Sequence, residues 1–223
     1  MVEPARHFAA EEFPALQRIP GVVHSFLGRA PGIDAAHDKA EALRRLDGIH
    51  REVREAYGIA SGPFVTAEQV HGNRVATVDR LFAADRCFAD CDGLITDQPG
   101  VCLGIYAADC CAVYLIDPLR KAIGLVHSGR KGTELDITGC AIELMSERFG
   151  SVPENLILQL SPCIRPPHYE IDFAAEIVRR ATERGVQQIH DAGVCTACQP
   201  TRYYSYRAEK GKTGRMLALL AMV

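Results

Sequence analysis

The sequence lacks a long run of apolar residues. None of its apolar stretches approaches the roughly 20 residues that a membrane-spanning helix needs. Residues 1–21 also lack the uninterrupted apolar region of a secretion signal, because acidic residues and prolines interrupt this segment. We therefore expect a cytoplasmic protein whose partners do not include a membrane.

An excess of positive charge is missing as well. The 223 residues carry a formal charge of −3 at pH 7, and the pI is near 6.2. Nucleic acids and anionic membranes need a basic face on their protein partners, so neither is an expected partner. Tryptophan is also absent, but its absence excludes no class of function.

The eight histidines include no His-x-His pair. A multicopper oxidase needs many histidine ligands arranged in such pairs, together with a blue-copper cysteine. The composition therefore excludes a multicopper oxidase mechanism.

The residues that are present describe an ordinary globular protein. A hydrophobic share of 48% in 223 residues is enough for one domain, residues 1–223, with a substantial core. The nine cysteines are expected to be reduced thiols in a cytoplasmic protein, and most are expected to be small buried hydrophobic residues.

The hydrophobic pattern predicts helices interleaved with short strands. Such a pattern is typical of an α/β or α+β domain in which helices cover mixed sheets. Short β-rich runs lie on both sides of "HGN" and again in "GLIT", "VCLGIY", "AVYLID", "KAIGLVHSG" and "NLILQLSPCI". Helices are expected over residues 34–58, 133–150 and 172–185, and the final segment, 203–223, is expected to be a polar loop followed by a short apolar helix.

Three short segments place potential metal ligands where strands are predicted to end. They are "EQVHGN" with His71, "ADCC" with Cys110, and "LVHSG" with His127. Two imidazoles and one thiolate would leave the fourth position of a tetrahedral zinc site open for water or substrate, as in catalytic zinc sites. The three residues lack the short spacing of common zinc motifs, so each could instead be a buried polar group or thiol.

The same residues suit a different chemistry. Cys110 could be a nucleophilic thiolate with His127 as its base, and Asp109 or another acid could orient the imidazole. The adjacent Cys111 would point to the opposite face of a strand, where a core thiol is expected.

Other segments carry weaker signals. The pair Cys195 and Cys198 has the CxxC spacing of redox or zinc sites, but a second CxxC pair is lacking. "CFADC" (Cys87 and Cys91) could join it only by an unsupported pairing of loops. "GRKGT" is glycine-rich and basic and could cradle an anion, but it lacks the Walker pattern of a nucleotide-binding loop.

Six motifs, taken in order, resemble the laccase-domain family, also called the multicopper polyphenol oxidase family, whose members are understood largely as zinc-containing purine nucleoside enzymes. The family patterns Q-V-H-G, D-G-L-x-T, A-D-C-x-P-V, H-A-G-W-R-G, G-P-x-I-x-x-x-x-Y-E-V and S-x-R-x-x-x-x-T-G-R have counterparts here. They are "QVHG" (69–72), "DGLIT" (92–96), "ADCCAV" (108–113), "HSGRKG" (127–132), "SPCIRPPHYEI" (161–171) and "SYRAEKGKTGR" (205–215).

The resemblance implies a four-layer α-β-β-α sandwich, and it implies that His71, Cys110 and His127 bind zinc and form the catalytic centre. The implied reaction is phosphorolysis of adenosine, inosine, guanosine and methylthioadenosine, with an accompanying adenosine deamination. From their charge and placement, Arg29 and Lys131 are the substrate-binding cations that we expect to hold phosphate.

The sequence departs from the family pattern near the expected pocket. Arg130 replaces the motif tryptophan, Lys131 replaces its arginine, and Ala112 replaces the proline after the cysteine. Loss of the tryptophan would weaken stacking on a purine, and an ammonium grips an oxyanion differently from a guanidinium. Three alternatives stay open. One is a divergent zinc-binding paralogue with weakened catalysis, and one is a cysteine-dependent amide hydrolase, for example one acting on peptidoglycan precursors, that uses Cys110 and His127. The third is a non-enzymatic interaction module that zinc stabilises.

Overall fold

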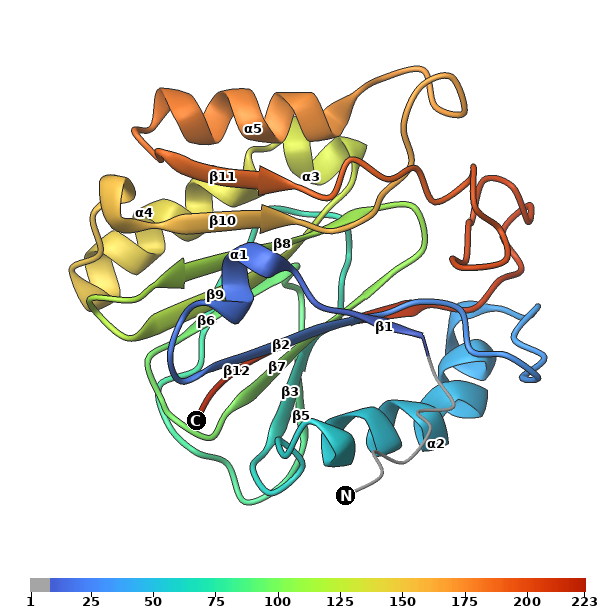
Figure 1. The fold of residues 1–223 in the computed structure, drawn as a ribbon, viewed down its shortest axis with the longest axis horizontal. Coiled ribbons are helices and arrows are strands. Elements are labelled where there is room, and N and C mark those ends of the chain that lie inside the picture. The colour runs from blue at the N-terminus through green and yellow to red at the C-terminus, as the bar shows by residue number, and fades with distance from the viewer. Residues whose placement is uncertain (1–8) are drawn as a thin grey trace.

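Two mixed six-stranded sheets form the centre of the molecule. A computed structural model describes residues 9–223 (Figure 1). The first sheet has the order β1 (Ala10–Glu11), β2 (Val22–Leu27), β12 (Met216–Met222), β7 (Cys102–Ala107), β3 (Phe64–Ala67) and β5 (Arg86–Phe88). The second has the order β11 (Gln188–Asp191), β10 (Ile157–Leu160), β8 (Cys111–Asp117), β9 (Ala122–Ser128), β6 (Gly93–Thr96) and β4 (Val75–Thr77).

Helices cover the outer faces of both sheets. The first sheet is covered by α2 (Lys39–Ala56), while α3 (Arg130–Glu134), α4 (Ile137–Phe149) and α5 (Phe173–Glu183) lie over the second (Figure 1). The short helix α1 (Pro14–Gln17) precedes β2, and a 3-10 turn (Pro153–Asn155) precedes β10. No helix within residues 9–223 is long and apolar enough to cross a membrane.

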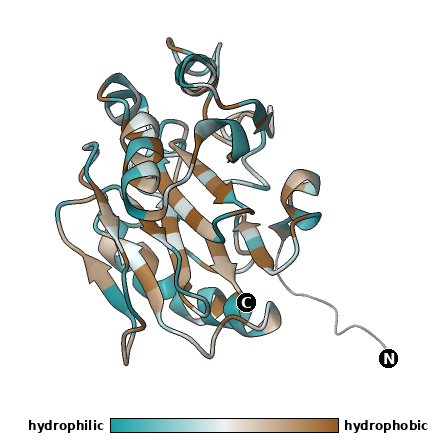
Figure 2. Ribbon diagram, turned by 90° about the vertical axis from the view of Figure 1, so that its left-hand side faces the viewer, coloured by the Kyte–Doolittle hydropathy of each residue, from teal (hydrophilic) through white to brown (hydrophobic). Residues whose placement is uncertain are grey.

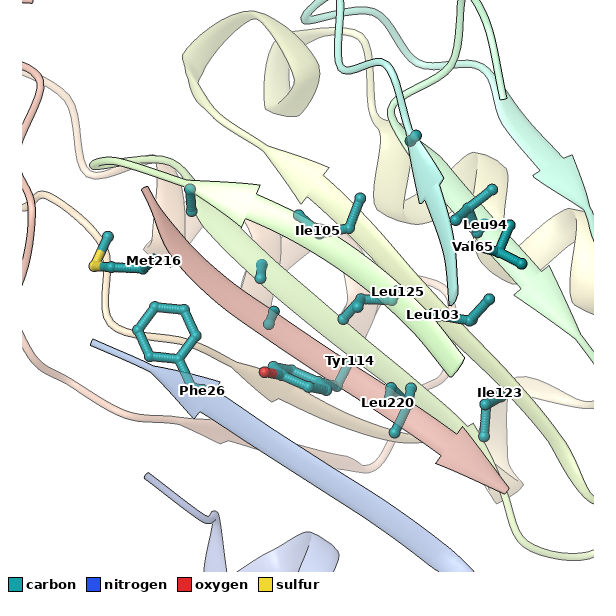
Figure 3. Packing of buried hydrophobic residues seen from close by; sticks show 14 of the residues in the cluster. Phe26, Val65, Leu94, Leu103, Ile105, Tyr114, Ile123, Leu125, Met216 and Leu220 are labelled. Atoms are coloured by element: carbon teal, nitrogen blue, oxygen red, sulfur yellow. The ribbon is translucent and has the colours of Figure 1, made fainter. Parts of the chain in front are cut away.

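Three apolar cores separate four layers. The central core lies between the sheets and includes Phe26, Leu103, Tyr114 and Leu125 (Figure 3). A second core joins the second sheet to α4 and α5, and a third joins the first sheet to α2. The ribbon coloured by hydropathy shows apolar strands at the centre and polar residues on the outer helices (Figure 2). The expected four-layer α-β-β-α sandwich is confirmed.

The C-terminal segment is a strand, so the helix expected near the end of the chain was wrong. β12 lies between β2 and β7 and pairs antiparallel with both. Its even-numbered residues enter the central core, and its odd-numbered residues face the core under α2. A strand buried on both faces shows no alternation of apolar and polar residues, so the sequence pattern resembles that of a buried helix.

The other expected helices are shorter than predicted. α2 begins after Asp38, whose carboxylate accepts a hydrogen bond from the backbone of Glu41. The helix expected over residues 133–150 is divided into α3 and α4, because Asp136 has a left-handed backbone and caps α4 with its side chain. The "GRKGT" segment forms most of α3, with Gly129 at the N-cap position.

Within residues 9–223, six strand connections cross from one sheet to the other, and two of them carry residues of the candidate site. The chain leaves β3 in the first sheet and enters β4 in the second. It makes the same change between β7 and β8. The break at "ADCC" is therefore the point where the chain leaves one sheet for the other. His71 and Cys110 lie in these two crossings.

Two buried histidines make the stability of this fold depend on pH. On β2, His24 accepts a hydrogen bond from the backbone of Phe13 at 2.7 Å and stacks on its ring, and His50 is buried on α2. Burial lowers the pKa of each histidine to about 4. Because the unfolded chain binds protons near pH 6.5 and the folded chain does not, both histidines reduce stability as the pH falls from about 6.5 toward 4.

We expect His24→Gln to reduce this pH dependence. The free energy of unfolding of the variant should fall less between pH 7 and pH 5 than that of the natural protein, by about 1–2 kcal/mol. Urea unfolding of both proteins at both pH values measures the difference. The comparison of the two proteins cancels the contribution of the other titrating groups. An equal fall in both proteins would contradict the assignment.

Candidate metal centre

His71, Cys110 and His127 come together at the seam between the two sheets. Their ligand atoms all lie within 4.8 Å of one another. His127 is near the end of β9, and the two imidazole rings meet edge to face with centroids 5.0 Å apart. His71 is exposed, Cys110 is partly buried and His127 is buried, so the cluster opens to solvent on the His71 side.

The loop that carries His71 is fixed to the end of β7. Gln69 and His71 both have left-handed backbones, with φ of 65° and 63°. The side chain of Gln69 donates to the carbonyl oxygen of Tyr106 and accepts from its backbone N–H at 3.0 Å. The Gln69 side chain thus makes with Tyr106 the two hydrogen bonds that a neighbouring strand would make. These bonds fix the position of the loop that continues to His71.

Asp92 joins the His71 loop to His127. Its fully buried carboxylate lies 3.0 Å from His127 Nδ1 and accepts the backbone N–H groups of Val70, His71 and Gly72 at 2.7–3.1 Å. A proton held between Nδ1 and the carboxylate leaves Nε2 of His127 free to bind a metal. A carboxylate behind a histidine ligand is the usual outer support of a metal site.

The charges of these groups stabilise one another. Burial disfavours the Cys110 thiolate, but the nearby imidazoles of His127 and His71 outweigh burial and lower the pKa of Cys110 to about 6. Burial also opposes charge on His127, and the Cys110 thiolate and Asp92 outweigh it and raise the pKa of His127 to about 9. The site therefore favours the thiolate form that metals bind.

Gly129 leaves the space that Cys110 occupies. A Cβ atom at position 129 would lie 2.4 Å from Cys110 Sγ, closer than any side chain permits. Gly129 has an ordinary backbone, with φ of −98°, so the requirement for glycine comes from this contact alone.

The three ligands lie in the wall of a pocket of about 930 Å³. Its other walls are mainly aromatic and basic. The aromatic residues are Tyr106, Tyr169, Phe173 and Tyr206, and the basic residues are Lys39, Arg130, Lys131, Arg207, Lys210 and Arg215. The pocket thus offers flat apolar surfaces and positive charge beside the candidate metal site.

Only one of the two cations predicted to bind substrate lines this pocket. Lys131 does so from α3. Arg29 is not among the lining residues: its guanidinium donates to the carbonyl oxygen of Tyr203 and forms an ion pair with Glu209 at 2.8 Å. The structure therefore gives Arg29 a place in holding the 203–209 segment.

Asp109 does not orient His127. Its carboxylate instead accepts the hydroxyl of Thr196 and the backbone N–H of Arg207, both at 2.7 Å. Asp92 instead orients the imidazole of His127. This role was not predicted from the sequence, although Asp92 begins the "DGLIT" motif. The signal was an acidic residue directly before a short strand that is buried along its whole length.

The remaining cysteines lie outside the ligand cluster. Cys111 is fully buried against the helical layer, as expected from its alternation with Cys110. Cys195 and Cys198 lie in one turn, and neither Cys87 nor Cys91 joins them in a group of metal ligands within residues 9–223.

Comparison with known proteins identifies the family of the chain. The family described as multi-copper polyphenol oxidoreductase laccase matches residues 32–176 and 168–223. A purine nucleoside phosphorylase of Deinococcus radiodurans is 30% identical over 233 residues, covering 90% of this chain and 89% of that protein. Purine nucleoside phosphorylase YlmD of Bacillus subtilis is 28% identical over 196 residues, covering 71% of this chain and 70% of that protein.

Solved structures share the fold. The crystal structure of YlmD from Geobacillus stearothermophilus has a TM-score of 0.77 at 23% identity and covers 92% of this chain and 93% of that one. A hypothetical protein of Bacillus licheniformis, YfiH, also has a TM-score of 0.77, at 22% identity, with coverage of 91% and 93%. Together, the matching segments and the relatives show that this chain belongs to the multi-copper polyphenol oxidoreductase laccase family.

Proposed function

We propose that this protein is a zinc-dependent purine nucleoside phosphorylase that acts on adenosine, inosine, guanosine and methylthioadenosine, and that it also deaminates adenosine. The observation that carries this proposal is the convergence of His71, Cys110 and His127 in the wall of a pocket with aromatic and cationic surfaces. The names of the relatives in Deinococcus radiodurans and Bacillus subtilis support the same activity.

The ligand set fits zinc. Two imidazole nitrogens and one thiolate are donors that zinc prefers, and three protein ligands are typical of catalytic rather than structural sites. Asp92 occupies Nδ1 of His127 and so leaves Nε2 as the nitrogen available to a metal. Zinc, when bound, supplies a Lewis acid with one coordination position free for a substrate atom or water.

The chain itself supplies the surfaces that bind a nucleoside. Tyr169 and Phe173 meet edge to face, with ring centroids 5.9 Å apart, and Tyr206 lines the pocket from the 205–215 loop. These rings provide the apolar surface for a purine that the motif tryptophan would otherwise supply. Arg130, which replaces the tryptophan, is held by Glu134 at 2.9 Å. Lys131 lies beside it and lines the same pocket, which supports a contact with the substrate.

A cysteine hydrolase is the second candidate, and a specific contact favours it. Cys110, His127 and Asp92 are connected in the order of a nucleophile, a base and an orienting acid. This arrangement suits attack on an amide carbonyl as well as it suits metal binding. The two candidates differ in their response to chelation.

We expect Cys110→Ala to lose zinc and activity together. The natural protein should contain about one zinc per chain and release free purine base from adenosine or inosine only when phosphate is present. Metal analysis and chromatography of the products measure both properties.

The other outcomes separate the alternatives. Zinc without turnover of any nucleoside would indicate the divergent paralogue with weakened catalysis. Loss of activity on alkylation of a metal-free protein, with no effect of a chelator, would indicate the cysteine hydrolase.

We expect Asp92→Asn to weaken zinc binding about 10- to 100-fold, because the amide no longer holds the proton of His127 Nδ1 as the carboxylate does. Competition with a chromogenic chelator measures the affinity. The melting temperature of the metal-free variant shows separately how much the loss of backbone contacts destabilises the fold. An unchanged zinc affinity would contradict the orienting role of Asp92.

We expect Gly129→Ala to remove zinc while keeping all three ligands, because the new methyl group would displace Cys110 Sγ. Gly72→Ala is the matched control. Gly72 directly follows His71, but a Cβ atom there would have only ordinary contacts, at 3.6 Å or more. Equal zinc content in the two variants would show that the contact between residues 129 and 110 does not control the site.

A further inference from the structure

Four of the basic residues that line the pocket have no carboxylate partner. Arg130 and Arg207 form ion pairs with Glu134 and Glu170. Across residues 9–223, no ion pair forms at the other four, which are Lys39, Lys131, Lys210 and Arg215. Such unpaired cations beside a partly enclosed pocket favour an anionic ligand.

Arg215 presents one free edge of its guanidinium. It directly precedes β12, and its Nη1 donates to the carbonyl oxygens of Thr213 and Gly214 at 2.6 and 2.9 Å. Within the described chain, Nε and Nη2 have no hydrogen-bond acceptor. These two N–H groups point the same way in a guanidinium, and such a fork matches two oxygens of a phosphate.

Lys39 completes a pair of cations with Arg215. It is the first residue of α2, and its Nζ donates to the carbonyl oxygen of Glu68 at 2.8 Å, leaving two N–H donors. Lys39 and Arg215 line the same pocket, where burial and the positive charge of Arg215 both lower the pKa of Lys39. An anion between them would offset the repulsion between the two charges.

Both cations line the same pocket as the ligand cluster, and Lys39 is attached to the loop that carries His71. Glu68, which anchors Lys39, belongs to the loop that carries His71, and Gln69 lies in the same pocket wall. Arg215 is near enough to Cys110 and Asp109 for their negative charges to act on it. Lys131 enters the pocket from α3, on a different element.

We propose that Lys39 and Arg215 form the binding site for inorganic phosphate, the co-substrate of phosphorolysis, while Lys131 serves the nucleoside. This inference rests on the proposed function. A phosphate oxygen would attack C1′ of the ribose as the bond from C1′ to the purine nitrogen breaks. The bonding electrons leave with the purine, and the proton of hydrogen phosphate ends on the purine nitrogen, giving free base and ribose 1-phosphate.

The test separates the two substrates kinetically. In zinc-loaded protein, Lys39→Met should raise KM for phosphate at least about tenfold, as expected for loss of a charge-assisted hydrogen bond, with KM for inosine nearly unchanged. Lys39→Arg should restore part of the phosphate affinity. Lys131→Met should raise KM for inosine instead.

Lys212→Met is the matched control. Lys212 is an exposed lysine of the 205–215 loop that does not line the pocket, so this variant loses the same charge from the same region. Its KM for phosphate should equal that of the natural protein. A phosphate KM in Lys39→Met equal to that of this control, or a larger rise in Lys131→Met, would overturn the proposal.

A direct binding measurement keeps the two proposals distinguishable. Calorimetric titration of the zinc-loaded protein with phosphate should show binding that weakens in Lys39→Met and not in Lys212→Met. Phosphate binding with this pattern but no phosphorolysis would retain the anion site and reject the proposed reaction. Phosphorolysis with equal phosphate affinity in all variants would retain the proposed reaction and reject the anion site.

Discussion

The buried carboxylate of Asp92 is the contact on which the candidate site depends. One oxygen faces His127 Nδ1, and both oxygens accept backbone N–H groups of the loop that carries His71. A charged group without water is costly to bury unless its hydrogen bonds are satisfied, and here the protein satisfies them with the groups that must be positioned. The hydrogen bonds that stabilise the buried charge therefore hold both His127 and the His71 loop in position.

The rest of the site follows from how the chain passes between the sheets. Cys110 lies in the crossing from β7 to β8, where neighbouring residues point in opposite directions. The side chain of Cys110 points toward the ligand cluster. Cys111, the next residue, is already in the core beneath the helices. Gly129, directly after the end of β9, then leaves the space that Cys110 Sγ occupies.

The three candidate ligands could be predicted from the sequence because each one follows an apolar strand-like run and belongs to a motif. The role of Asp92 could not, because an acidic residue before a strand is usually exposed and gives no sign of burial. The pairing of Arg29 with Glu209, across 180 positions of sequence, could not be predicted either. Such long-range pairing has no local signal. The same limit applies to β12, whose apolar residues on both faces hide the two-residue period of a strand.

The position of the ligands at the seam has a consequence for motion. His71 and Cys110 lie in crossings between the sheets, and His127 lies on a strand of the second sheet. An ion bound by all three would link the two sheets, so the sheets could not separate locally without releasing the ion. Amide hydrogen exchange near the ends of β7 and β9 and the rate of metal dissociation would then report the same opening event.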